Sequence, residues 1–222
     1  CSSDLVLTDH VADLLFCPSK TAVANLTAEG VHDGVHLVGD VMYEALMHAV
    51  TLAHQKSDVL ERLNLTPSSY ALATIHRAEN TDDPERLARL MAALQEVSCK
   101  MPVIFPVHPR TRGKLGPLAA GGDLRLLDPQ GYLDMVRLEA GASVILTDSG
   151  GIQKEAYWLR VPCVTLRDET EWVETVAQGW NVVAGADCDV ILRAARQPVR
   201  PKTRDDAYRG EGSVGRLIQA LG

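Results

Sequence analysis

The sequence around Ser149 has the residue types and spacing of a phosphate-binding turn. An apolar run over Ser143–Thr147 ends in Asp-Ser-Gly-Gly and passes directly into a helical pattern. Gly150 and Gly151 allow close approach of the backbone to a ligand, the helix start offers unpaired N–H groups, and Ser149 adds a hydroxyl. Glu155, about one turn further on, could accept hydrogen bonds from both hydroxyls of a ribose. The alternative is a plain strand–helix turn with a surface glutamate.

Four further polar clusters each come directly after an apolar run that predicts a strand. In the first, His76 could pair with a phosphate or shuttle a proton. In the second, His108 or Arg110 could meet an anion, and in the third, Gln130 could hydrogen-bond to a flat base. The fourth has the acidic residues of a helix start. Each of the four clusters, taken alone, could equally be an ordinary turn. The clusters occupy residues 76–80, 108–110, 128–132 and 167–174.

Taken together, these clusters predict one ligand-binding rim on an α/β fold. Strands that are apolar on both faces and alternate with helices are typical of a parallel sheet covered on both sides. The carboxyl ends of such strands share one edge, where ligands bind. We therefore predict a Rossmann-like parallel sheet with helices on both faces. The predicted strands are 70–75, 103–107, 124–127, 143–147, 163–166 and 181–183, and the helices between them are 84–97, 132–139, 152–159, 172–177 and 190–195.

The ends of the chain carry less apolar surface than a domain needs. A strand is predicted over Leu14–Phe16, followed by a helix over Lys20–Ala28 that Ser19 could cap. One long helix is predicted over Val41–Leu63, and a short one over Ser213–Leu221. The terminal pieces are expected to pack on something else.

Composition narrows the class of protein. With 46% hydrophobic and 23% charged residues among 222, the chain reads as a globular protein, and no apolar run suits a membrane helix or a signal peptide. A net charge of −7 without a basic stripe argues against a nucleic-acid partner. Five cysteines without a CxxC motif suggest reduced thiols in a cytoplasmic protein, a catalytic cysteine being the alternative. We expect no metal and no cofactor, because no tight cluster of ligand residues occurs.

Five motifs follow one another in an order that points to a family. They are His76-Arg77-x-Glu79-Asn80, Pro106-Val107-His108-Pro109, Asp128-Pro129-Gln130-Gly131-Tyr132-Leu133, Thr147-Asp148-Ser149-Gly150-Gly151-Ile152-Gln153-x-Glu155-Ala156 and Leu166-Arg167-Asp168-x-Thr170-Glu171. Together they resemble the non-hydrolysing UDP-N-acetylglucosamine 2-epimerases, and the likeness runs from Leu7 to the tail.

The resemblance implies two Rossmann-like domains facing across a cleft, as in glycosyltransferase-B enzymes, with this chain as the carboxyl-terminal half. It implies a UDP-sugar substrate, with a catalytic His76 near the phosphates and sugar. Arg77 and His108 match positions that bacterial relatives use for an activating second nucleotide-sugar. The implied UDP ligands are Gln130 for the uracil, Ser149, Gly150 and Gly151 for the diphosphate, and Glu155 for the ribose; further substrate or allosteric candidates are Arg77, Glu79, His108, Arg110, Thr170 and Glu171.

The resemblance also sets expectations for domains and partners. Residues 1–38 would be the end of an amino-terminal domain whose remainder is absent, and 39–205 the UDP-binding domain. Residues 206–222 would form a helix that packs back on the amino-terminal domain. Family members use that domain for most of their acid/base carboxylates, so the fragment is expected to be inactive alone. A homodimer is expected as well.

The implied reaction is inversion at C2 of a UDP-linked 2-acetamido sugar through elimination and re-addition of UDP. Family members often have arginine where Trp172 stands. Together with residues 39–43, this resembles a subgroup that acts on diacetamido-glucuronic sugars, so the substituents at C3 and C6 stay open. Two alternatives remain: the UDP-binding half of a glycosyltransferase, and a non-enzymatic UDP-sugar binding module.

Overall fold

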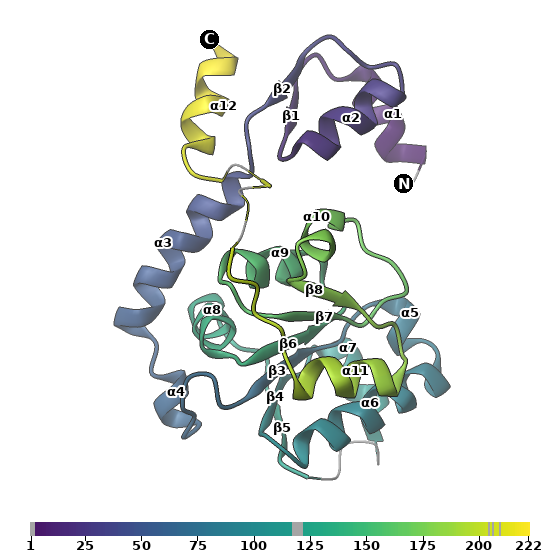
Figure 1. Cartoon of the computed structure of the whole chain (residues 1–222), viewed down its shortest axis with the longest axis vertical. Coiled ribbons are helices and arrows are strands. Elements are labelled where there is room, and N and C mark those ends of the chain that lie inside the picture. The colour runs from purple at the N-terminus through teal and green to yellow at the C-terminus, as the bar shows by residue number, and fades with distance from the viewer. Residues whose placement is uncertain (1–2, 117–121, 204, 206, 209) are drawn as a thin grey trace. The chain divides into compact units, whose positions relative to one another are not determined.

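The computed structural model describes residues 3–116, 122–203, 205, 207, 208 and 210–222, and these form two compact units (Figure 1). One unit contains Cys1–His48 and Asp205–Gly222, and the other contains Ala49–Arg204. The division falls inside the helix α3 (Val41–Lys56). The domain boundaries expected near residues 38 and 205 stay predictions.

The larger unit is built on a six-stranded parallel sheet in the order β5-β4-β3-β6-β7-β8. This is the order of a doubly wound Rossmann sheet, in which the direction of winding reverses between β3 and β6. The predicted strands are confirmed to within one residue at each end. The strands are β3 (Ala71–Thr74), β4 (Val103–Pro106), β5 (Leu124–Leu127), β6 (Val144–Thr147), β7 (Cys163–Thr165) and β8 (Asn181–Val183).

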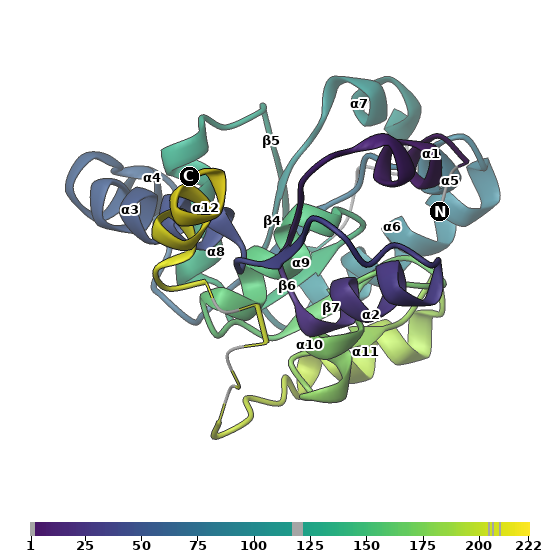
Figure 2. The same ribbon diagram turned by 90° about the horizontal axis from the view of Figure 1, so that it is seen from above.

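Helices cover both faces of this sheet, which confirms the predicted fold class. Along β3, Ala71 and Ala73 join a core cluster that includes side chains of α6 and α11. Tyr70 and Leu72 point to the other face, where they join side chains of α8 and α9. α11 lies beside α6 (Figure 1). Figure 2 shows α8 and α11 on opposite sides of β6 and β7. The helices of the unit are α4 (Val59–Arg62), α5 (Ala78–Thr81), α6 (Pro84–Ser98), α7 (Pro109–Leu115), α8 (Tyr132–Gly141), α9 (Gly150–Trp158), α10 (Val173–Ala177) and α11 (Cys188–Arg196).

The prediction of one helix over Val41–Leu63 is wrong. α3 ends at Lys56, and α4 begins at Val59. The hydroxyl of Ser57 donates to Asp134 Oδ1 at 2.5 Å and accepts from the amide of Val59 at 3.4 Å. A serine that bonds to nearby backbone competes with helical hydrogen bonding, so the helix breaks here although the apolar spacing continues.

Two short helices that were not predicted, α5 and α7, follow β3 and β4. α7 has strong local signals: Pro109 occupies its first turn, and the His108 ring caps its start by accepting from the amide of Arg110. Both helices therefore begin inside a polar cluster of the predicted rim, and they fix the direction of the side chains there.

The smaller unit contains a parallel strand pair, β1 (Leu15–Cys17) and β2 (Val35–Leu37), with β2 not predicted. Ser19 caps α2 (Lys20–Ala28) by accepting from the amide of Ala22, as predicted. The predicted helix α12 (Ser213–Leu221) is present, and it is tied to residues 38–40: the Ser213 hydroxyl donates to the carbonyl of Asp40, and the Arg216 guanidinium to that of Val38. α1 (Ser3–Val11) completes the unit. Within the described ranges, no helix has both the length and the apolar character needed to cross a bilayer.

Candidate functional site

The ends of β3 and β6 meet at the point where the sheet reverses its winding. Thr74 and Thr147 are paired in register, and their hydroxyl oxygens lie 2.6 Å apart. Thr147 Oγ1 also accepts from the amide of Ser149 at 2.9 Å. The polar clusters after the two strands therefore start at the same level, in the crevice where open α/β sheets bind ligands.

Asp148 joins these two clusters. Its side chain is fully buried and accepts from the amides of His76 and Arg77, the latter at 2.9 Å. It also accepts from Asn80 Nδ2 at 3.0 Å and lies 3.2 Å from His76 Nδ1. The motif after β3 is thus folded around the carboxylate of the residue that follows β6. Asp148 was not among the predicted site residues, although it is the first residue of the Asp-Ser-Gly-Gly motif.

The start of α9 has the form that the glycine motif predicts. Ser149 has extended backbone angles, and its hydroxyl oxygen caps the helix by accepting from the amide of Ile152 at 3.5 Å. Ser149 is half-buried, Gly150 is buried and Gly151 is exposed. A Cβ added at Gly151 would meet only the Ser149 hydroxyl oxygen, at 3.8 Å. The first turn therefore faces open space on the side of Gly151, and the unpaired amides at a helix start can bind an anion.

A hollow of about 180 Å³ lies along the same rim. It is lined by candidates from three predicted clusters, His76, His108 and Gln130, and by Ile152 of α9. The His76 and His108 ring centroids are 5.9 Å apart. The side-chain amide of Gln130 donates to the carbonyl of Asp128 at 2.7 Å. The clusters after β3, β4 and β5 thus meet at one cavity, which α9 borders through Ile152.

Arg167 links the remaining acidic candidates. Its side chain is only 11% exposed, and its guanidinium donates to Glu171 at 2.8 Å and lies 3.4 Å from Glu79. Burial alone would raise the pKa of Glu171, but its own backbone amide and Arg167 outweigh burial and lower the pKa, with a further contribution from Arg77. A Cβ on Gly150 would lie 2.5 Å from the Glu171 carboxylate, so this carboxylate borders the start of α9.

The loop that carries Glu171 is fixed to α9 by polar contacts. Thr170 donates to the buried Gln153 side chain at 2.6 Å, and Asn181 of β8 donates to the same oxygen at 3.3 Å. The Lys154 ammonium lies 4.3 Å from the ring centroid of Trp172, within range of a cation–π interaction. These contacts set the distance between the loop and the helix start.

Arg110 is a candidate whose guanidinium is already engaged in an ion pair. Its guanidinium pairs with Asp82 at 3.1 Å, and Lys114 bonds to the same carboxylate. The hydrogen bond from Lys114 lowers the pKa of Asp82, burial opposes this, and the charges of Arg110 and Lys114 lower the pKa further. An anion that binds Arg110 would have to compete with Asp82.

Glu155 lies half-buried on α9, and its charge acts on the carboxyl group of Glu139 in α8. Burial raises the pKa of Glu155, and Lys154 opposes this. Burial, then the charge of Glu155, raises the pKa of Glu139 well above its usual range. Glu139 Oε2 is buried and has no hydrogen-bond partner among the described residues. Glu139 is therefore a carboxyl group that the fold tolerates at a cost.

Glu139→Met is expected to stabilise the larger unit by about 1–3 kcal/mol at pH 8. A carboxyl whose pKa is raised by folding costs nothing below its unfolded pKa, and the cost grows as pH rises to the folded pKa. The gain should therefore be small near pH 4 and largest at pH 8, measured by urea unfolding. Glu61→Met on the exposed surface of α4 is the control. An equal gain at both pH values would contradict the interpretation.

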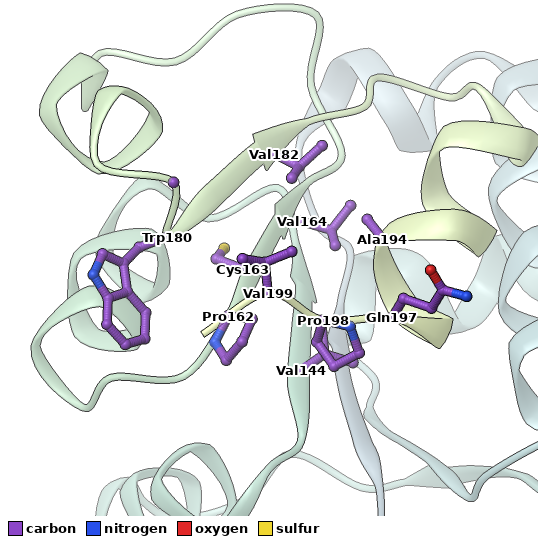
Figure 3. A pocket seen from close by; sticks show the side chains of 11 residues that line it. Val144, Pro162, Cys163, Val164, Trp180, Val182, Ala194, Gln197, Pro198 and Val199 are labelled. Atoms are coloured by element: carbon purple, nitrogen blue, oxygen red, sulfur yellow. The ribbon is translucent and has the colours of Figure 1, made fainter. Parts of the chain in front are cut away.

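The opposite edge of the sheet carries a different, apolar hollow of about 50 Å³ (Figure 3). Val144 and Cys163, the first residues of β6 and β7, line it together with Trp180 and Val199. Burial raises the pKa of the Cys163 thiol to about 12, so it stays protonated at neutral pH and is not an activated nucleophile. Cys1, also part of the thiol prediction, lies outside the described residues.

Comparison with known proteins assigns the family. The family described as UDP-N-acetylglucosamine 2-epimerase matches residues 6–222. The chain belongs to this family. The UDP-N-acetylglucosamine 2-epimerase homolog of Methanococcus maripaludis is 48% identical over 225 residues, which cover 97% of this chain and 62% of that protein. The UDP-2,3-diacetamido-2,3-dideoxy-D-glucuronate 2-epimerase of Pseudomonas aeruginosa is 41% identical over 222 residues, which cover 97% of this chain and 61% of that protein.

The solved structures agree with this assignment. The Methanocaldococcus jannaschii UDP-GlcNAc 2-epimerase, crystallised with UDP-GlcNAc and UDP, matches with a TM-score of 0.86 at 33% identity, covering 97% of this chain and 62% of that one. The epimerase-family chain therefore has the fold of the carboxyl-terminal part of a glycosyltransferase-B-like protein. It spans about three fifths of the length of the curated relatives named above.

Proposed function

We propose that this chain supplies the UDP-binding half of an enzyme that inverts C2 of a UDP-linked 2-acetamido sugar. The observation that carries the proposal is the junction at Asp148. Its carboxylate accepts from the His76 amide and lies 3.2 Å from the His76 ring, one residue before Ser149, the cap of α9. A histidine next to a helix start is suited to a ligand that carries phosphate close to its reacting atoms. The names of the relatives supply the substrate class.

In the proposed reaction, a base removes the C2 proton while UDP leaves from C1, and UDP then adds back after reprotonation from the other face. Charge develops on the β-phosphate as the bond to C1 breaks. The amides of Gly150 and Gly151, the Ser149 hydroxyl and His76 would stabilise that charge more in the transition state than in the ground state. Glu155 would bind the ribose, and Gln130 would turn from its own loop towards the uracil.

The other candidates are proposed to surround the sugar or a second nucleotide-sugar. Thr170 and Glu171 lie on the loop fixed to α9, and Arg167 places Glu79 near Glu171. Arg77 and His108 are proposed for an activating second ligand. Arg110 would join them only after release from Asp82.

We propose that the preferred substrate is a diacetamido-uronic UDP-sugar, with UDP-N-acetylglucosamine as the alternative substrate. The 41% identity to the Pseudomonas aeruginosa enzyme supports this choice. So does Trp172, which takes part in a cation–π contact with Lys154 where the family pattern often has an arginine. Comparison of kcat/KM for the two sugars tests it.

An amino-terminal domain and a second copy of the protein are the proposed partners, and the cytoplasm the proposed compartment. Cys17, Cys99, Cys163 and Cys188 are free thiols, which suits a reducing compartment. Sedimentation of the protein that carries these 222 residues would give the mass of a dimer if the proposal is right.

The reaction is tested by incubating that protein with each UDP-sugar in D₂O without an acceptor. Deuterium at C2 together with the inverted sugar is the expected result. Turnover that strictly requires an acceptor would favour a glycosyltransferase, and binding without exchange would favour a binding module. The experiment separates all three candidate functions.

Glu155→Gln is expected to weaken UDP binding about 10- to 100-fold, because a hydrogen bond to a charged group contributes about 1.5–3 kcal/mol. The wild-type affinity should fall as pH falls through the raised pKa of Glu155, and the variant should lose this dependence. Calorimetry with UDP measures both effects. Pyrophosphate, which has no ribose, is the control ligand; if the variant weakens pyrophosphate binding equally, Glu155 does not bind the ribose.

A further inference from the structure

Two histidines from different strands share the hollow at the rim. His76 follows β3, and His108 follows β4. Both line the cavity of about 180 Å³, and their ring planes are inclined at 36°. Each uses its Nδ1 atom for a contact with a protein group, which leaves Nε2 as the nitrogen available to a ligand.

The partner of His76 can only accept. Its Nδ1 lies 3.2 Å from Oδ1 of the buried Asp148. The Asp148 carboxylate already accepts from two amides and from Asn80, so it is arranged as an acceptor throughout. A contact between this carboxylate and Nδ1 requires a proton on Nδ1. In the neutral ring, Nε2 then carries a lone pair.

The partner of His108 can only donate. The amide of Arg110 donates to His108 Nδ1 at 3.2 Å, as part of the cap of α7. A backbone N–H has no acceptor capacity, so Nδ1 of His108 must carry the lone pair. The proton of the neutral ring is then on Nε2.

We propose that the fold holds His76 and His108 in opposite tautomers, so that one presents an acceptor and the other a donor to the hollow that they share. Asp148 is the positioning residue for His76, and the Arg110 amide plays this part for His108. His76 can then accept a ligand hydroxyl or take up a proton, and once protonated on Nε2 it donates to the charge that develops on the β-phosphate. His108 donates to a ligand oxygen from the start. The identity of that ligand as a UDP-sugar rests on the proposed function, whereas the tautomers do not.

The tautomers are tested on the ligand-free chain labelled with ¹⁵N-histidine, by long-range ¹H–¹⁵N correlation at pH 8.5, about two units above the ordinary histidine pKa. The chain has seven histidines, and H76Q and H108Q assign the two signals. The expected pattern is a proton on Nδ1 of His76 and on Nε2 of His108. The same tautomer at both, a mixture at His76, or a doubly protonated His76 would overturn the proposal.

Asp148→Asn tests the positioning role. An asparagine amide can donate to Nδ1, so His76 should change to the Nε2–H tautomer while His108 keeps its own. In the protein that carries the chain, kcat should fall on the order of 10²- to 10⁴-fold with a smaller change in KM, as when the carboxylate of a catalytic triad is replaced. An unchanged His76 signal in the folded variant would overturn the role of Asp148. If the variant does not fold, the wild-type spectrum alone decides.

Asp58→Asn is the matched control, because Asp58 is an exposed carboxylate that pairs with Arg62 on α4. It should change neither histidine signal nor kcat. The two claims fail separately: a wrong tautomer overturns this inference and leaves UDP binding in place, while correct tautomers without any UDP-sugar turnover would overturn the proposed function.

Discussion

Gly151→Asp is expected to weaken UDP binding by about 100-fold or more, because two like charges placed together in a binding site cost several kcal/mol. The same substitution is expected to make the larger unit more stable. The side chain has room, because Gly151 is exposed and an added Cβ meets only the Ser149 hydroxyl. A carboxylate in the first turn interacts favourably with the helix dipole, by about 0.3–1 kcal/mol. Removal of a helical glycine adds about 0.5–1 kcal/mol. The same charge repels a diphosphate at this position.

Gly151→Asn separates charge from size. It is nearly isosteric with the aspartate variant and should weaken UDP binding by less than about tenfold, since it removes no amide and adds no charge. Calorimetry gives the affinities, and thermal unfolding gives the stabilities. Equal losses in the two variants would show that bulk, rather than charge, excludes the ligand. Full UDP binding by Gly151→Asp would place the diphosphate elsewhere.

Asp148→Ala is expected to lower the free energy of unfolding by about 3–5 kcal/mol. The substitution removes the acceptor of the His76 and Arg77 amides and of the Asn80 side chain, all within the turn after β3. Buried donors without a partner each cost about 1–3 kcal/mol. The turn should therefore open, and UDP binding should fall with it.

Asp168→Ala is the matched control on the same rim. Asp168 accepts two hydrogen bonds from the Arg86 guanidinium, and its side chain is 75% exposed. Exposed ion pairs contribute less than about 1 kcal/mol. Urea unfolding of both variants tests whether burial makes the difference. Equal destabilisation by the two substitutions would contradict the role assigned to Asp148.

The strands of the larger unit could be predicted because they are apolar on both faces, which only a sheet covered on both sides requires. The start of α9 could be predicted for a similar reason: Ser149 and the two glycines act within a few residues of one another. Ser19 and α2 are another local case. Signals that act over one turn of chain are visible in the sequence.

The contacts of Asp148 could not be predicted, because they depend on which strands are neighbours. His76 and Asp148 are 72 residues apart, and they meet because β6 pairs with β3 across the reversal of the sheet. Arg110 shows the same limit, since the sequence does not reveal that Asp82 lies within reach. Arg167 likewise serves as a link between Glu79 and Glu171 only in the folded chain.

A crystal structure of the chain with UDP bound is the most direct test of the central claim, that the open first turn of α9 binds the diphosphate. Phosphate oxygens should lie within hydrogen-bond distance of the Ser149 hydroxyl and of the amides of Gly150 or Gly151, with the ribose at Glu155. Density for UDP at another place, with this turn empty, would contradict the account.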